Sequence, residues 1–207
     1  MLKNQLLAAL FSLICVISLS STTFGCACCS ERGTYNVWTG KPDAYHLGLI
    51  REIKFGKAAE LYMTEAAFES IRGLAALQKE SDAGTMGDLS LVDMFTNNTW
   101  QMTIKTAGGK SGTLTLPVPS KMTIFKADTH EKSEESGEIT VYKEFQFKGT
   151  VASGSGIFRG GIVRPTTYSL VFQGRGNNCD NAEDFAHWRL DVLGSKASYA
   201  FFGKLKS

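Results

Sequence analysis

The sequence predicts a single, mostly β domain with antiparallel strands, built as an up-and-down barrel or as a two-sheet sandwich with one short helix. Apolar residues recur at every second position through most of the chain, which places them on one face of a strand. Apolar residues make up 43% of the chain and charged residues 20%, as in an ordinary globular protein, and 21 glycines against 4 prolines indicate many tight turns. A length of 207 residues suits one core.

Residues 1–25 are predicted to be a signal peptide. Lys3 supplies a positive charge, and the apolar run from Leu6 to Leu19 is about 14 residues long, too short to span a bilayer comfortably. Cleavage after Gly25 or after Ala27 satisfies the small-residue rule, and we prefer Gly25. The chain is therefore expected to be exported to the periplasm, the cell envelope or the extracellular space, with residues 26–207 as the single β domain; an uncleaved anchor is the alternative.

The segment Thr23-Phe24-Gly25-Cys26 resembles the lipobox of bacterial lipoproteins, in which a small residue precedes a cysteine that becomes lipidated. It departs from that pattern because Thr23 stands where the family usually has leucine. The resemblance implies membrane attachment through a lipid on Cys26, and a free N-terminus is the alternative.

Cleavage before Cys26 removes Cys15 and leaves Cys26, Cys28, Cys29 and Cys179. In an oxidising compartment we expect this even set to form disulfides. A bridge from the N-terminal cluster to Cys179 closes a loop of about 150 residues, worth about 4 to 5 kcal/mol in the chain-entropy account. The sequence does not determine the pairing, although a bridge between the neighbours Cys28 and Cys29 would be strained.

A metal site is the competing hypothesis for these cysteines. Cys26, Cys28 and Cys29 crowd three thiolates together, and Cys179 and His187 are candidates to complete a copper or zinc shell. Two adjacent cysteines rarely both reach one tetrahedral ion, so the spacing favours disulfides.

Several runs predict strands, about eight to ten in all, and glycines predict the turns between them. One amphipathic helix is expected at Glu65–Glu80, capped by Thr64, because apolar residues there recur every third position. Residues 79–88 and 128–138 are expected to be surface loops. The length of the strand at Ile139–Val151 favours the barrel over the sandwich. The alternating runs are Tyr45–Phe55, Trp100–Ile104, Leu114–Val118, Ile139–Val151, Tyr168–Phe172, Trp188–Val192 and Tyr199–Leu205, with turns at Gly108–Gly109, Gly154, Gly156 and Gly160–Gly161.

Catalytic motifs are weak in this sequence. Gly109-Lys110-Ser111 lacks the earlier glycine of a phosphate-binding loop, and no Gly-x-Ser-x-Gly elbow accompanies His46, His130 or His187. The polar stretch Gly174–Asp184 is longer than a turn requires, and the preferred interpretation is a loop pinned by Cys179. The alternative is a calcium site, because the stretch contains several oxygen ligands.

Three functional hypotheses follow, in order of preference. The first is an exported, non-enzymatic module that binds a small apolar ligand or serves as a structural or interaction module of the cell envelope. The second is a metal-binding or redox protein using the cysteine cluster, and the third is a hydrolase with an unrecognised site. Nucleic acid is not expected as a partner, because 22 Lys and Arg barely exceed 20 Asp and Glu.

Overall fold

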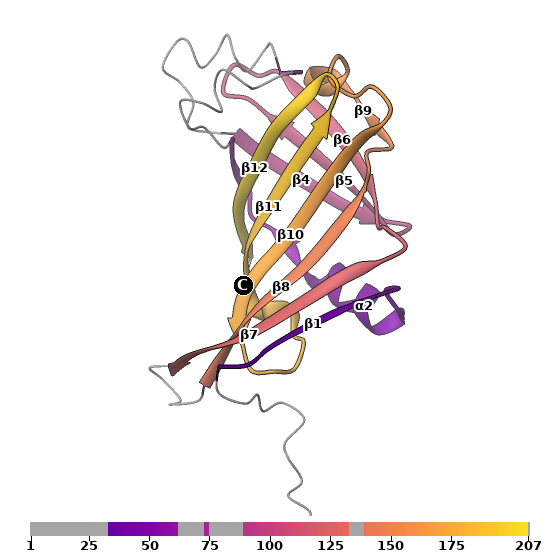
Figure 1. Ribbon diagram of the computed structural model, residues 1–207. Helices are drawn as coiled ribbons and strands as arrows, with labels where there is room; N and C mark the ends of the chain where they lie inside the picture. The colour runs from indigo at the N-terminus through magenta and orange to yellow at the C-terminus, as the bar shows by residue number, and fades with distance from the viewer. Residues whose placement is uncertain (1–32, 62–72, 75–88, 133–138, 207) are drawn as a thin grey trace, which may run out of the picture.

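The computed structural model describes residues 33–61, 73–74, 89–132 and 139–206, without the side chains of 129–132 and 139. These residues form a twelve-stranded sheet and one α-helix (Figure 1), which confirms the predicted mostly β class and exceeds the expected number of strands. Every strand pairing in it is antiparallel. The strands are β1 (Tyr35–Gly40), β2 (Lys54–Phe55), β3 (Ala58–Leu61), β4 (Leu89–Thr96), β5 (Thr99–Lys105), β6 (Ser111–Pro117), β7 (Met122–Lys132), β8 (Ile139–Thr150), β9 (Ser153–Gly154), β10 (Thr166–Gly176), β11 (Phe185–Gly194) and β12 (Ala197–Lys206).

The sheet curves strongly and does not close into a barrel. Its strands follow the order β1-β7-β8-β10-β11-β12-β3-β4-β5-β6-β9, and β2 pairs with β12 beside this path. At one end the chain passes from β8 directly into β9, which pairs with β6, so the two halves of the sheet approach each other there. The preference for a closed barrel was therefore wrong, and the fold is one coiled open sheet.

The α-helix α2 (Ala44–Glu52) overlaps the run Tyr45–Phe55 that we predicted as a strand. Asp43 caps its N-terminus by accepting a hydrogen bond from the His46 backbone N–H at 2.9 Å, and the His46 side chain completes a capping box. Leu49 and Ile50 are buried side by side, which alternation does not allow but a helical face does. The helix expected at Glu65–Glu80, with its cap Thr64, lies outside the described residues except for Gly73 and Leu74.

Five strands were not predicted. In β1 every residue is at least partly exposed, and β3, β4 and β9 were not identified, the last because Gly154 was expected to lie in a turn. Strand β7 continues to Lys132 through part of the expected 128–138 loop. The turn at Gly108–Gly109 joins β5 to β6 as expected, with Gly109 at φ +81°. Two short 3₁₀ helices, η1 (Gly156–Phe158) and η2 (Ala182–Asp184), interrupt the connections around β10.

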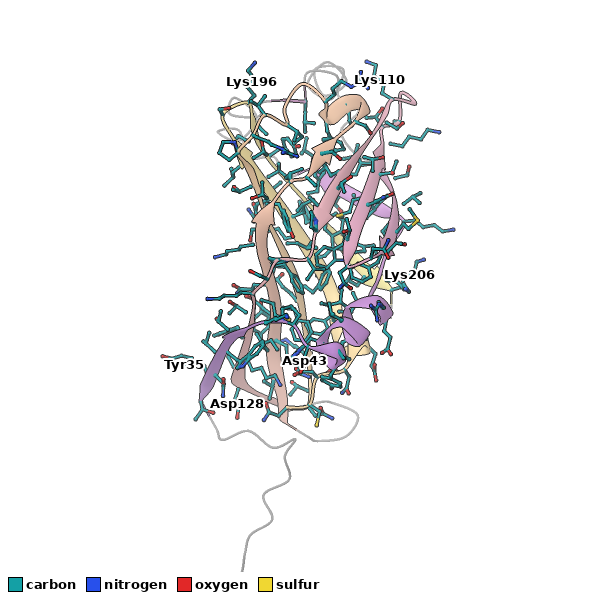
Figure 2. The ribbon with its side chains drawn as sticks, turned by 90° about the vertical axis from the view of Figure 1, so that its right-hand side faces the viewer. Tyr35, Asp43, Lys110, Asp128, Lys196 and Lys206 are labelled. Atoms are coloured by element: carbon teal, nitrogen blue, oxygen red, sulfur yellow. The ribbon has the colours of Figure 1, made fainter. Side chains whose placement is uncertain are left out.

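The inner face of the curved sheet is packed with side chains (Figure 2). Aromatic rings meet edge to face across it: Trp100 lies 5.0 Å from Phe147, Phe147 lies 5.6 Å from Phe172, and Phe55 lies 5.3 Å from Trp188. All five side chains are almost fully buried. These aromatic side chains form a packed core on the inner face of the sheet.

No helix among the described residues is long and apolar enough to cross a membrane.

Candidate functional site

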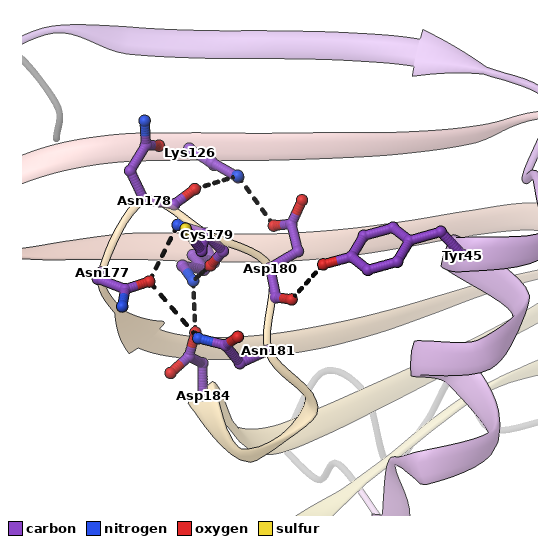
Figure 3. A network of polar contacts seen from close by, with 9 residues as sticks. Tyr45, Lys126, Asn177, Asn178, Cys179, Asp180, Asn181 and Asp184 are labelled. Atoms are coloured by element: carbon purple, nitrogen blue, oxygen red, sulfur yellow. Dashed lines mark hydrogen bonds and ion pairs between the residues drawn. The ribbon is translucent and has the colours of Figure 1, made fainter. Parts of the chain in front are cut away.

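The loop between β10 and β11, residues 177–184, folds back over one end of the sheet and is held by polar contacts (Figure 3). Asn177 Oδ1 accepts a hydrogen bond from the Cys179 backbone N–H at 2.9 Å. Tyr45 on α2 donates its hydroxyl to the backbone oxygen of Asp180 at 2.7 Å, which ties the helix to the loop. The loop is therefore an ordered part of the domain.

Two inward-facing lysines anchor the loop. Lys126 on β7 and Lys143 on β8 stand directly opposite each other in the strand register. Lys126 lies 2.9 Å from the carboxylate of Asp180, and Lys143, whose side chain is fully buried, donates to the Asp184 carboxylate and to the backbone oxygen of Cys179. Burial lowers the pKa of the Lys143 ammonium group, and the ion pair with Asp184 opposes that shift.

Two glycines on β10 make room for this arrangement. A side-chain carbon at Gly174 would overlap the backbone oxygen of Asp184, and one at Gly176 would overlap its carboxylate. Glycine is needed here because the returning loop occupies the space that side chains would fill.

Two of the three carboxylates in the loop form ion pairs with lysines of the sheet. Asp180 and Asp184, the carboxylates that a calcium site would use, are each paired with a lysine. No group of three or more His, Cys, Asp and Glu side chains among the described residues has the geometry of a metal site. The loop thus closes one end of the sheet as a polar plug, which favours the structural interpretation over a calcium site.

A groove of about 740 Å³ lies where the β2–β3 segment runs beside β12. The strand register carries one row of side chains across the strands as Gln173, His187 and Lys204, and a second row as Arg189, Phe202 and Glu60. His187 and Arg189 are exposed on either side of buried Trp188, so they project from the face of β11 opposite the core. The groove therefore belongs to the outer face of the sheet.

The groove combines an apolar surface with an excess of positive charge. Phe202 and Ala58 supply apolar area. The lining also contains two lysines, Lys57 and Lys204, but only one carboxylate, Glu60. Arg189 also lines the groove, but its charge is balanced by Asp191, with nitrogen–oxygen distances from 2.7 to 3.1 Å.

Glycines allow the strands to approach closely at the groove. An added side-chain carbon at Gly203 would lie 2.8 Å from the Ala58 backbone oxygen and 2.9 Å from Trp188 Nε1. The Gly56 backbone N–H donates to the Lys204 oxygen at 2.8 Å. The indole N–H of Trp188 is buried beside Gly203 and has no hydrogen-bond partner among the described residues. The close approach of β12 to Trp188 therefore requires a glycine at position 203.

The residues predicted as site candidates lie in different places. Cys179 is in the polar plug, where its backbone N–H donates to Asn177 and its backbone oxygen accepts from Lys143, whereas His187 lines the outer groove. Cys26, Cys28 and Cys29 fall outside the described residues, so their pairing, the copper or zinc site and the lipidation of Cys26 stay predictions. Of the other histidines, His46 belongs to the capping box of α2, and the side chain of His130 lies outside the described residues.

Sequence reasoning missed the plug lysines and most of the groove. Lys143 occupies an inward position of the alternating β8 run, between Val141 and Phe145, and a lysine in that position indicates a buried cation with an acidic partner. The groove left no comparable pattern, because strand register brings its residues together from distant parts of the chain.

Comparison of the chain with protein-family models, with curated proteins and with solved structures found no match. Function is therefore inferred from the chain's own residues and geometry.

Proposed function

We propose that this chain is an exported, non-enzymatic binding protein whose outer groove holds a small, mostly apolar ligand carrying one acidic group. The observation that carries the proposal is the groove itself, of about 740 Å³, formed by Phe202 and Ala58 among cationic side chains. Small-ligand sites commonly have this size and this combination of apolar surface with a few polar groups.

The packed aromatic core supports a site on the outer face. Trp100, Phe147 and Phe172 occupy the centre of the curved sheet, and the polar plug occupies one end. A ligand seated inside would have to displace packed aromatic side chains. Losing the packing of one buried Phe or Trp lowers the free energy of unfolding by roughly 3 to 5 kcal/mol. The outer groove requires no such rearrangement.

The charges in the groove favour an acidic ligand. The two positive charges of Lys57 and Lys204 exceed the negative charge of Glu60 by one, and the charge of Arg189 is already balanced by Asp191. A carboxylate placed near Lys204 gains an attraction that a neutral group of the same shape does not. Phe202 contacts the apolar body of such a molecule.

Export and disulfide formation belong to the same proposal. Cys29 is six residues before Tyr35, a reach of about 20 Å for an extended chain. Tyr35 pairs with Ala127, and the neighbouring Lys126 bonds to the loop that carries Cys179. We propose a bridge between the N-terminal cysteine cluster and Cys179; lipidation of Cys26, or copper or zinc binding by Cys26, Cys28, Cys29, Cys179 and His187, remains the competing use.

Decanoate and decanol, which share a chain and differ in charge, test the ligand proposal. Tryptophan fluorescence and calorimetry should show that the mature protein binds decanoate, and Lys204→Met should weaken that binding about tenfold, which corresponds to about 1.4 kcal/mol. Phe202→Ala should weaken the binding of both molecules, because it removes apolar contact.

Lys105→Met is the matched control, since Lys105 is exposed on β5 and does not line the groove. It should bind decanoate like the unmodified protein. Absence of decanoate binding, or equal effects of Lys204→Met and Lys105→Met, would overturn the proposal.

A further inference from the structure

Strand β1 forms one margin of the sheet (Figure 1), and no described residue pairs with its outer edge. The strand has the sequence Tyr-Asn-Val-Trp-Thr-Gly, without any charged residue or proline. Tyr35 is 74% exposed, Val37 55% and Trp38 39%. Edge strands of stable monomers are usually protected by charges, prolines or bulges, and β1 has none of these within its six residues.

The hydrogen-bond pattern shows which backbone groups are available. The Asp128 N–H donates to the Thr34 oxygen at 2.9 Å, so the alternation of an antiparallel ladder directs the polar groups of Asn36, Trp38 and Gly40 toward β7. Those of Tyr35, Val37 and Thr39 point away from it. The outer edge therefore offers three alternate residues, each with one backbone donor and one backbone acceptor.

We propose that two copies of this chain pair through β1, antiparallel and related by a two-fold axis at Val37. In this register Val37 lies opposite Val37 of the second copy, and Tyr35 lies opposite Thr39, so the three available residues exchange about six hydrogen bonds. Asn36 lies opposite Trp38 on the other face. The pairing is self-complementary, as an isologous dimer requires.

A second copy fits this edge better than an open chain of copies. The strand at the other end of the sheet path, β9, has only two residues and cannot match the six of β1, so head-to-tail pairing is poorly supported. The absence of charge in β1 and a net charge of only +2 on the chain also leave little repulsion between copies. The edge therefore favours a closed dimer.

Val37→Pro tests the backbone pairing. Because the Val37 N–H points away from β7, proline there removes an outer donor and leaves the β1–β7 bonds in place. Sedimentation equilibrium of the full mature chain should show a dimer, with a dissociation constant raised at least about tenfold by Val37→Pro and changed less than about threefold by Val37→Thr. Circular dichroism should show that both variants keep the fold.

A charge exchange at the same position tests the register. Val37→Lys and Val37→Glu should each be monomeric, because the two-fold axis places like charges directly opposite each other. A mixture of the two variants should restore a dimer containing one of each. A monomeric unmodified protein, a dimer insensitive to Val37→Pro, or a mixture that stays monomeric would overturn the proposal.

Discussion

Tyr199 has its hydroxyl group buried among apolar side chains. Its ring lies 5.5 Å from that of Phe201 and 5.9 Å from that of Phe158, and its oxygen has no hydrogen-bond partner among the described residues. The pKa of this hydroxyl is strongly raised by burial. Tyr168 is buried similarly, but its hydroxyl donates to the backbone oxygen of Pro117.

Tyr199→Phe should leave the free energy of unfolding at neutral pH unchanged or slightly higher, since it removes an unpaired polar group. Tyr168→Phe should lower it by about 1 kcal/mol, because the Pro117 oxygen loses its donor. Chemical denaturation of both variants measures the difference. Equal losses for the two substitutions would show that the Tyr199 hydroxyl has a partner.

The same tyrosines predict sensitivity to alkali. In an unfolded chain the tyrosine pKa is about 10, whereas burial raises the pKa of Tyr168 and Tyr199 in the folded protein. The folded chain then holds more protons than the unfolded one, so stability is fully present below about pH 10 and falls as pH rises above it. Denaturation series between neutral and alkaline pH should show this fall, and Tyr199→Phe should make it shallower.

At the scale of elements, the polar plug depends on β10 having no side chains where the loop returns. Asp184 fills the space beside Gly174 and Gly176, and Lys143 holds it there. Even one added carbon requires the loop to move. The connection between β10 and β11 is therefore more constrained than its polar sequence suggests.

Gly174→Ala should lower the free energy of unfolding by about 3 kcal/mol, because the new carbon overlaps the Asp184 backbone. Gly160→Ala is the control, since no atom lies within 4 Å of the position that its new carbon would take. Urea unfolding of both variants gives the comparison. If Gly174→Ala lowers the free energy of unfolding no more than Gly160→Ala does, the loop can move away from the new carbon at little cost.

Gly48→Ala provides an opposite test on α2. Gly48 is inside this helix and no atom lies within 4 Å of an added side-chain carbon, and replacing a helical glycine by alanine in such a position commonly stabilises by about 0.5 to 1 kcal/mol. The midpoint of urea unfolding should rise. A fall would indicate that α2 is not a helix in the folded chain.

Sequence patterns predicted the strands that have one exposed face and one buried face. The run around Phe145 and Phe147 became β8, and the runs at Trp188 and Tyr199 became β11 and β12. The pattern failed where burial does not alternate: β1 is exposed throughout, and β7 places Lys126 and Asp128 on its inner face. The nine-residue α2 is too short for its period to compete with apparent alternation.

At the scale of the whole molecule, the proposed export of the chain predicts the state of its cysteines. Intact mass measurement of the mature protein should give residues 26–207 with four cysteines oxidised and no reactive thiol. Reduction should lower the free energy of unfolding by about 4 kcal/mol if a bridge joins Cys179 to the N-terminal cluster. Free thiols with bound copper or zinc would favour the metal hypothesis instead, and an added lipid mass would establish lipidation of Cys26.

The position of β12 in the middle of the sheet affects when the domain can fold. Along the hydrogen-bonded path, β12 joins the half that contains β7, β8, β10 and β11 to the half that begins with β3. Strand β12 is synthesised after every other strand described. Both halves of the sheet therefore emerge from the ribosome before the strand that joins them. A chain shortened before Ala197 should be left with two unpaired edges and be prone to aggregation or proteolysis. Until β12 is synthesised, the edges of β11 and β3 that it will cover stay accessible to chaperones.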